Sequence, residues 1–480
     1  AEESLLSEEV SIWHGGPGPA RRNQLLPWDT TDDGEFVLDG LGQHNKGLIA
    51  EFSTKPKNVE VGYLTIRNLE PDSGCSIGED LIAIYMKCSG GEGCANWWFH
   101  HNNITDMGVN CNVQSHYIAL QPSNTPNLLF EHNYLTRIGG FMMRYFAGDN
   151  ITIRENHFEV HGTGIKAWGE YQDNLQVIDN TFLCDGNGYN NPGDEAVKCG
   201  GQTAVNFANN IQHGIIRGNT FEDCVLPINI GSDDRAGYRI NAHHIVENNF
   251  IRQTENVCTA NANAIAIDDV ADPSPVTSSQ LQVKDVLYRN NVMIFDHPVA
   301  KASTGAAIVI RAGHPFDFTS DIRFYHNTIQ GYRWGVLPAV GSTYDYQLNG
   351  VDFRNNIFSN IHDAQVNTGD FDRDGLSPPA NWQMNHNVYS GADVFVWNGS
   401  EYDFSGWQSL GRDGLGAFCA PTFADPTTLS LAGSDTCALD QGQVLAEVPS
   451  DLDGDPRPNG AASDIGADEV VARNRKLLRR

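Results

Sequence analysis

The chain has 480 residues and a formal net charge of −29, from 60 acidic and 31 basic residues. This excess of negative charge disfavours nonspecific binding to nucleic acid or to an anionic membrane. Hydrophobic residues make up 40% of the chain, which is enough for a folded core and argues against disorder. No apolar run approaches the ~20 residues needed to span a bilayer, so we expect neither nucleic acid nor a membrane as a partner.

Residues 1–57 precede the first clear repeat and contain the loop-like stretches HGGPGPARR and DTTDDGEF. We interpret them as an N-terminal segment and cap that protects the open end of a repeat fold. The first residues, AEESLLSEE, lack the charged and apolar regions of a signal peptide. This is what we expect of a secreted chain whose signal peptide has been removed.

One pattern recurs from residue 58 to about residue 400: an alternating apolar run, then Asn or an Asn pair, then one or two apolar residues. Its spacing of 23 to 42 residues is the size of one coil of a parallel β-helix. The alternation predicts short strands with one buried face. An Asn at each corner tolerates the left-handed conformation and can stack on the Asn of the next coil as a ladder. The expected ladder residues are Asn68, Asn103, Asn133, Asn156, Asn180, Asn219, Asn249, Asn291, Asn327, Asn356 and Asn387.

We therefore predict an all-β fold, a single-stranded right-handed parallel β-helix over residues 58–400, with a C-terminal cap or flap over residues 401–480. Hairpin signals are nearly absent and no long helical periodicity is found, which disfavours a β-sandwich or an array of separate β modules. The stretch from Tyr402 to Val471 is richer in Gly, Asp and Pro, and we expect it to pack back along the coils. The basic tail RNRKLLRR is interpreted as a frayed end.

The sequence contains ten cysteines and no CxxC pair. An even number without a metal-binding or redox motif favours disulfides formed in an oxidising compartment, either outside the cell or in a periplasm. The local pairs expected first are Cys88 with Cys94, and Cys419 with Cys437.

The segment DLDGDPRPNGAASDIGADEV, from Asp451 to Val470, resembles the closing segment of many secreted bacterial right-handed β-helix proteins. Together with the Asn pattern, this resemblance implies the pectate-lyase-like β-helix superfamily over nearly the whole chain. It implies no single activity, because that fold carries lyases, hydrolases, epimerases, phage depolymerases and adhesins.

Two local resemblances within that superfamily point to acidic polysaccharides. The run AVKCGG, then GIIRGNTFEDC, then LPINIGS resembles the alginate lyases related to chondroitinase B, which implies a role for Lys198 and places Asn229 where that family has an Arg. Its acidic calcium-binding pattern is echoed by Asp194 and Glu195, which makes calcium the one metal implied. The run GDEAVKCGG is also similar to the polygalacturonases, but their N-T-D, G-H-G and R-I-K motifs are missing, so this resemblance ranks lower.

Aligning the strands that follow each Asn corner places Arg144, Lys166 and Lys198 at equivalent positions of three successive coils. Neighbouring coils lie ~4.8 Å apart, so the three cations would form one row. Stacked like charges are unfavourable without an anionic partner. The row therefore predicts binding of an acidic polysaccharide.

Such a row suits a lyase that acts on a uronic-acid polymer. Arg144 would clamp the carboxylate because its guanidinium is bidentate and permanently charged. Lys198 would remove the C5 proton if the neighbouring cations, Arg144 and Lys166, lower its pKa. Tyr189 and His161, in loops before two of these strands, are alternative acids or bases.

Further residues of the same strip are candidates for binding sugar. Trp168 could stack on a pyranose ring. Asn229, Arg235 and Arg311 are the remaining candidate substrate-binding residues. Trp97 and Trp98 are adjacent in a strand, so one of them must point into the core.

Three functions remain open at the level of sequence. The first is a secreted polysaccharide lyase that cleaves an alginate-like polymer by β-elimination. The second is a glycoside hydrolase or a mannuronan C5-epimerase on the same fold. The third is a non-catalytic glycan-binding adhesin or phage-tail-type protein. A hydrolase would use carboxylate pairs, which could equally bind calcium: Asp194 with Glu195, Asp233 with Asp234, and Asp268 with Asp269.

Overall fold

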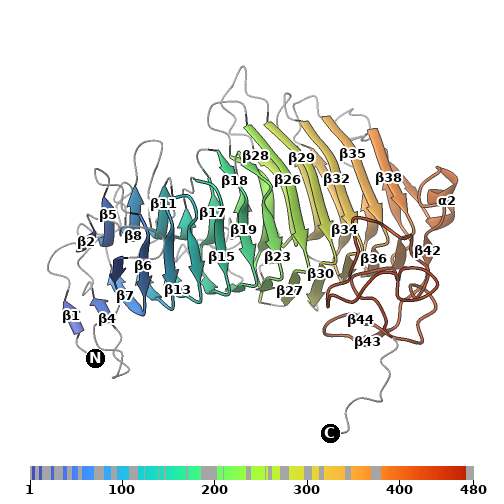
Figure 1. Cartoon of the computed structure of the whole chain (residues 1–480). Coiled ribbons are helices and arrows are strands. Elements are labelled where there is room, and N and C mark those ends of the chain that lie inside the picture. Colours follow the sequence, from blue (N-terminus) through green and yellow to red (C-terminus); the bar gives the residue numbers. More distant parts are fainter. Residues whose placement is uncertain are drawn as a thin grey trace, which may run out of the picture.

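Three sheets of stacked strands run through the molecule, and each coil of the chain contributes one strand to each sheet in turn, as the computed structural model shows (Figure 1). Within these three sheets the described strand pairs are parallel except for the last pair of one sheet, and a separate two-stranded sheet near the C-terminus is antiparallel. The prediction of an all-β, single-stranded parallel β-helix is confirmed. The structure describes residues 3–5, 10–12, 23–25, 36–39, 46–51, 57–69, 81–87, 95–107, 117–123, 125–138, 140–144, 148–168, 171–184, 203–208, 210–233, 239–254, 256–257, 262–270, 281–296, 305–312, 318–340, 347–368 and 380–471.

Sheet A has 14 strands. They are β1 (Glu3–Leu5), β4 (Phe36–Asp39), β7 (Leu64–Leu69), β10 (Asn103–Met107), β13 (Tyr134–Ile138), β16 (His157–Val160), β20 (Thr181–Cys184), β24 (Thr220–Glu222), β27 (Phe250–Thr254), β30 (Val292–Asp296), β33 (Thr328–Gln330), β36 (Ile357–Ile361), β39 (Val388–Gly391) and β42 (Ala417–Phe418).

The last pair of strands in sheet B, β40 and β41, is antiparallel. Sheet B also has 14 strands. They are β2 (Val10–Ile12), β5 (Lys46–Glu51), β8 (Leu81–Lys87), β11 (Tyr117–Ser123), β14 (Phe141–Arg144), β17 (Thr163–Ala167), β21 (Thr203–Phe207), β25 (Leu226–Asp233), β28 (Ile265–Val270), β31 (Ala306–Ala312), β34 (Trp334–Val340), β37 (Ala364–Asn367), β40 (Phe395–Trp397) and β41 (Ser400–Tyr402).

Sheet C completes each coil, and two short strands, β18 (Gln172–Asp173) and β22 (Ile211–Gln212), extend it at one side. Its main strands are β3 (Asn23–Leu25), β6 (Val59–Gly62), β9 (Trp97–His100), β12 (Leu129–Glu131), β15 (Ile151–Arg154), β19 (Leu175–Ile178), β23 (Ile215–Arg217), β26 (Arg239–Glu247), β29 (Leu281–Arg289), β32 (Phe318–Tyr325), β35 (Gln347–Arg354) and β38 (Ala380–Asn385).

The interior of the coils is filled by rows of similar side chains. Phe158, Phe182 and Phe221 stack face to face, with ring centroids 4.8 and 4.9 Å apart. This distance is the ~4.8 Å spacing of the coils, because residues in register sit directly above one another. Trp97 is buried in the core while Trp98 lies half-buried on the outside, as the alternation predicts.

A ladder of buried asparagines follows the tight corner between sheets C and A. The backbone N–H and Nδ2 of Asn219 both donate to Oδ1 of Asn249, at 3.0 Å each, and Nδ2 also donates to the carbonyl of Val177. Every rung therefore satisfies backbone groups that the tight turn would otherwise leave buried and unpaired. The ladder residues are Asn102, Asn133, Asn156, Asn180, Asn219, Asn249, Asn291, Asn327, Asn356 and Asn387.

Two of the expected ladder residues are wrong. Asn102, not Asn103, forms the rung, since Asn103 is the first residue of β10. Asn68 lies in β7, and the rung position of that coil is held by Leu64, whose N–H donates to Asn102. The sequence pattern gave no way to choose between adjacent asparagines, because only the register of the turn decides which one points inward.

The left-handed residue of this corner comes one position before the ladder Asn. From His101 to His386 the preceding residue has a φ of 52 to 65°, whereas the ladder Asn itself is not left-handed. The expectation that the ladder Asn adopts this conformation is therefore wrong. The arrangement explains the Asn pairs, since in Asn248–Asn249 and Asn355–Asn356 the first Asn turns the chain and the second forms the rung.

Asp413 ends the ladder at its C-terminal side. It accepts from Nδ2 of Asn387 at 2.9 Å and from the hydroxyl of Tyr389 at 2.6 Å. A carboxylate suits this last position because it only accepts, and no further rung exists to receive a donor. Burial raises the pKa of Asp413 to about 6, although these hydrogen bonds act in the opposite direction.

Parallel pairing begins earlier than the sequence pattern indicated. Strands β1 and β2 pair with β4 and β5, and β4 pairs with β7. Strands of the three sheets therefore already occur among residues 1–57, which the sequence analysis assigned to an N-terminal segment and cap.

The C-terminal segment packs against the coils at the corner of sheets C and A. Leu445 and Val448 pack on Leu287 and Tyr325, and the N–H of Ala467 donates to Thr328. This segment contains α2 (Phe404–Ser409), β43 (Phe423–Asp425) and β44 (Ser430–Leu431). These contacts cover the outer side of β29 and β32, so this part of the segment packs back along the coils, as expected from the sequence.

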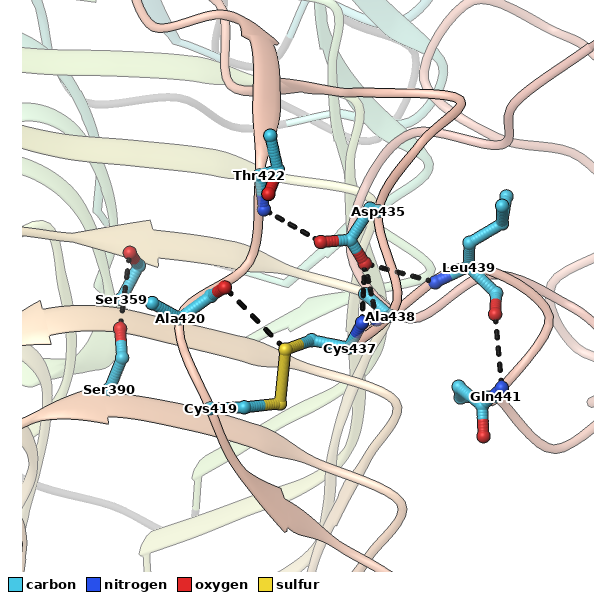
Figure 2. Close-up of a disulfide and its surroundings, with 10 residues drawn as sticks. All are labelled: Ser359, Ser390, Cys419, Ala420, Thr422, Asp435, Cys437, Ala438, Leu439 and Gln441. Atoms are coloured by element: carbon cyan, nitrogen blue, oxygen red, sulfur yellow. Dashed lines mark hydrogen bonds between the residues drawn. A yellow bond between two sulfur atoms is a disulfide. The ribbon is translucent and has the colours of Figure 1, made fainter.

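Asp435 and a disulfide organise the first part of this segment (Figure 2). Cys419 and Cys437 are bonded, as predicted from their proximity in sequence. The carboxylate of Asp435 accepts from the backbone of Thr422 at 2.7 Å and of Ala438 at 2.6 Å. These bonds join two stretches that lack regular secondary structure.

A second disulfide, between Cys184 and Cys224, joins neighbouring coils and was not expected from the sequence. Its partners are 40 residues apart in the chain, so only the coil register brings them together. The expected pair Cys88 and Cys94 lies outside the described residues.

Replacing a ladder residue should destabilise the fold strongly. Asn219→Ala leaves the N–H and Nδ2 of Asn180 without their acceptor, and each buried unsatisfied group costs about 1–3 kcal/mol. We expect a loss of about 3 kcal/mol, measured as a lowered denaturation midpoint. The exposed Asn150→Gly, which preserves a left-handed backbone, should cost about 1 kcal/mol or less. Equal losses of stability in the two variants would contradict the conclusion that the buried ladder contributes more to stability than the exposed one.

The Asp413 carboxyl should make stability depend on pH. Its pKa is 3.8 without burial and about 6 in the folded chain, so the folded state holds the proton more tightly. The free energy of unfolding should therefore fall as pH rises from about 4 through about 6, by roughly 3 kcal/mol at ~1.4 kcal/mol per pH unit. Denaturation of wild type and Asp413→Asn across this range measures it. A difference between the two that does not change with pH would refute the assignment.

Candidate functional site

The outer face of sheet B carries a row of polar side chains from four successive coils. Arg144 is in register with Lys166, Lys166 with Asn206, and Asn206 with Asn229. We call these four residues the sheet B strip. They face outward because their neighbours Ile165 and Val205 occupy the alternate positions and are fully buried.

The predicted row is thus correct for its first two members and wrong for the third. Lys198 is not in register with Lys166, because β21 begins at Thr203 and places Asn206 there. The run TAVNF supplies Val205 and Phe207 to the core at alternate positions. The run AVKCGG ends in two glycines, which have no side chain to fill the core. Lys198 itself lies outside the described residues, in the connection between β20 and β21.

Arg144 lies between two aromatic rings. Its Cζ is 4.4 Å from the ring centroid of Phe141 and 5.6 Å from that of Trp168, which comes from the next coil. Arg144 is buried, with 9% of its surface exposed, so these rings replace part of its hydration. Cation–π contacts of this kind hold a guanidinium in place without neutralising its charge.

The second half of the strip is uncharged. Nδ2 of Asn229 donates to Oδ1 of Asn206 at 3.4 Å, and Asn229 is 9% exposed. Oδ1 of Asn229 has no hydrogen-bond partner among the described residues. Beyond Asn229 the same row continues with Ala266 and Val309. Along this row the side chains therefore change from the cations and amides of the strip to apolar residues beyond it.

The other predicted residues are distributed as follows. Arg311 belongs to β31, and its Cα partner on β28 is Asp268, although the side chains of both lie outside the described part. Residues outside the described ranges are Tyr189, Asp194, Glu195, Asp234 and Arg235. Within the described ranges, no three His, Cys, Asp or Glu side chains are arranged to hold a metal ion.

His161 lies in the turn that leads into β17, next to a cluster that the sequence analysis missed. Tyr134 and Thr136 both donate to Glu159, and the ring of Tyr134 stacks on His157 with centroids 4.7 Å apart. Burial would raise the pKa of Glu159, but these hydrogen bonds and the two histidines lower it below its usual value. The cluster combines residues 23 to 25 positions apart, so only the register could reveal it.

The connections around sheet B differ from those at the opposite corner. From β9 to β39 the corner between sheets C and A always has two residues, because the buried ladder fixes its length. The connections that enter and leave sheet B vary, from two residues between β16 and β17 to 18 residues, 185–202, between β20 and β21. Insertions of varying length gather on the binding face of repeat proteins. The buried ladder does not fix the length of the connections beside sheet B, which makes sheet B the candidate binding face.

A comparison of the sequence with known protein families and with curated proteins gives no match. Among the described residues, no helix is both long enough and apolar enough to cross a membrane.

Proposed function

We propose that the chain is a secreted polysaccharide lyase that cleaves an alginate-like uronic-acid polymer at the sheet B strip. The observation that carries this proposal is the pair Arg144 and Lys166, which lie in register on adjacent coils of a chain with a net charge of −29. Residues in register on adjacent coils are ~4.8 Å apart along the helix axis, so both cationic side chains belong to one short stretch of this face. A polymer with one carboxylate on each sugar offers anions repeatedly and can form charge-assisted hydrogen bonds with both side chains.

In the proposed reaction, Arg144 binds the carboxylate of the sugar whose C5 proton is removed. Neutralising this carboxylate stabilises the negative charge that develops when C5–H breaks. The electron pair then forms the C4=C5 double bond, and the C4–O4 bond breaks. An acid gives a proton to O4, so the products are a new reducing end and an unsaturated uronate.

The remaining groups of the strip support this reaction in distinct ways. Lys166 binds a neighbouring carboxylate, while Asn206 and Asn229 offer amides to sugar hydroxyls or carboxyl oxygens. His161 lies in the turn before β17, five residues before Lys166 in the chain, and is one candidate acid or base. Tyr189 and Lys198 belong to the connection that enters β21, beside β17, and are the others.

Secretion is part of the proposal. The disulfides Cys184–Cys224 and Cys419–Cys437 suit an oxidising compartment. A polymer-degrading enzyme meets its substrate outside the cytoplasm, so the disulfides and the proposed substrate both support secretion.

A second candidate is a glycan-binding protein without turnover. The specific observation in its favour is that amides, not a third cation, follow Lys166 in the strip. Such a protein would bind acidic polymers through Arg144 and Lys166 and leave them intact.

The class of reaction can be tested directly. We expect incubation with alginate to raise the ultraviolet absorbance of the unsaturated uronate together with reducing ends. Pectate and glycosaminoglycans serve as comparison polymers. Reducing ends without absorbance would replace the lyase by a hydrolase, and solvent deuterium at C5 in uncut polymer would replace it by an epimerase. Retained binding without any product would favour the second candidate.

Substitutions in the strip should separate binding from chemistry. Arg144→Gln and Lys166→Gln should raise KM for alginate about tenfold each, since charge-assisted contacts contribute about 1.5–3 kcal/mol. Arg252→Gln, on the outer face of sheet A, is the matched control and should leave KM unchanged. If Lys198 is the base, Lys198→Ala should lower kcat by about 10²- to 10⁴-fold. Wild-type turnover in Lys198→Ala would assign the role of base to His161 or Tyr189 instead. An unchanged KM in both Gln variants would show that the sheet B strip does not bind the substrate.

A further inference from the structure

A polar groove of about 660 Å³ lies on the outer face of sheet C, away from the sheet B strip. It crosses β26, β29, β32, β35 and β38, the long neighbouring strands in Figure 1. Five coils at ~4.8 Å spacing give it a length of about 19 Å along the helix axis. Its lining residues are His243, Lys284, Asp285, Asp321, Arg323, Asn349, Gly350, Asp352, Asn381 and Gln383.

A second asparagine ladder lies on the outside of sheet C and ends at Asn174, before the groove begins at His243. Each coil from β6 onward bends there through one left-handed residue, and five successive ones carry Asn, linked by amide hydrogen bonds of 2.9 to 3.2 Å. These five residues are Asn58, Asn96, Asn127, Asn150 and Asn174.

The same bend is occupied by other residues where the groove lies. The left-handed residues of the later coils are His213, His243, Asp285, Asp321, Gly350 and Asn381. Histidine and aspartate, like asparagine, are enriched among non-glycine residues in the left-handed region, so the backbone conformation does not select among the three. What distinguishes the later coils is the chemistry of the side chains that this row presents to solvent.

Gly350 makes the hollow. It lies between Asp321 and Asn381 along the row, with a φ of 73°, and it has no side chain to continue the ladder. A Cβ at this position would lie 3.1 Å from Oδ1 of Asp321. The missing side chain therefore opens the floor of the groove.

The charges that line the groove are largely balanced. Asp285 is paired with His243 at 2.7 Å and with Arg323. Asp352 accepts from Arg354 and, at 2.9 Å, from the hydroxyl of Tyr325. Neither a strong anion nor a cation is favoured by such a surface.

Two lining groups have no charged partner among the described residues. Lys284 is partly exposed and makes no ion pair in the described part of the chain, and the same is true of Asp321. They add one donor group and one acceptor group to the amides of Asn349 and Gln383. On one side the groove meets the C-terminal segment, where Glu447 lies 4.0 Å from Arg323.

We propose that this groove binds a neutral saccharide chain, at a site separate from the sheet B strip. Sugar hydroxyls both donate and accept, and they match a surface that offers amides, carboxylates, an ammonium and a guanidinium without a net sign. An apolar ligand finds no apolar lining residue here. The site does not depend on the proposed lyase activity, because it lies on another sheet.

Gly350→Asn tests the proposal by restoring the ladder. Asn accepts the left-handed backbone, and its side chain would fill the floor beside Asp321. We expect wild-type protein to be retarded in native gels that contain at least one of β-glucan, mannan or xylan. We expect Gly350→Asn to weaken that binding at least tenfold, while circular dichroism and a cooperative thermal transition show that the variant is still folded. Gln383→Ala removes an exposed amide that accepts from Arg354 at 3.2 Å, and it should weaken the binding without any change at Gly350.

The controls place the binding on this groove. Gln176→Ala removes a comparable amide from sheet C several coils away and should bind like wild type. Arg144→Gln, on the sheet B strip, should also bind the neutral polymer like wild type. The proposal is overturned if no neutral polymer retards the wild-type protein, if Gly350→Asn and Gln383→Ala bind normally, or if only alginate and polygalacturonate bind.

Discussion

The buried asparagine ladder is the constraint on which the rest of this structure depends. A coil that turns in two residues leaves backbone groups inside the corner, and water cannot reach them. One Asn per coil satisfies these groups and, at the same time, bonds to the Asn of the next coil, as the bonds from Asn219 to Asn249 show. Because each rung requires its neighbour at a fixed distance, the ladder holds all coils in one register. Its end at the acceptor-only Asp413 follows from the same bonding rule.

A fixed corner on one side leaves the other connections free to vary. From β9 to β39 the turns between sheets C and A keep two residues, whereas the connections around sheet B reach 18 residues. The constant corner keeps strands in register, so that residues far apart in sequence, such as Arg144 and Lys166, are placed side by side. The outer residues and the connections of sheet B can therefore change without loss of the buried core.

The outer faces can therefore carry different chemistry on the same coils. The sheet B strip begins with cations that suit an acidic polymer, and the sheet C groove has balanced charge that suits hydroxyl groups. In both places a row of side chains runs along the helix axis, in the direction in which a bound polymer would extend. The two sites would allow one molecule to hold a mixed polysaccharide, or two polymers, at once.

The sequence by itself determined the fold class, the coil size and most ladder residues, because the alternation and the repeated Asn are local signals that one chain displays. It also paired Arg144 with Lys166 and Cys419 with Cys437 correctly. Only the tertiary structure decided that Asn102 forms the rung, that Asn206 follows Lys166, and that Cys184 meets Cys224. The reason is physical: similar runs such as AVKCGG and TAVNF compete for one strand position, and core filling by Val205 and Phe207 selects between them. The groove at Gly350 depends on the same register, since its residues come from five coils and share no motif.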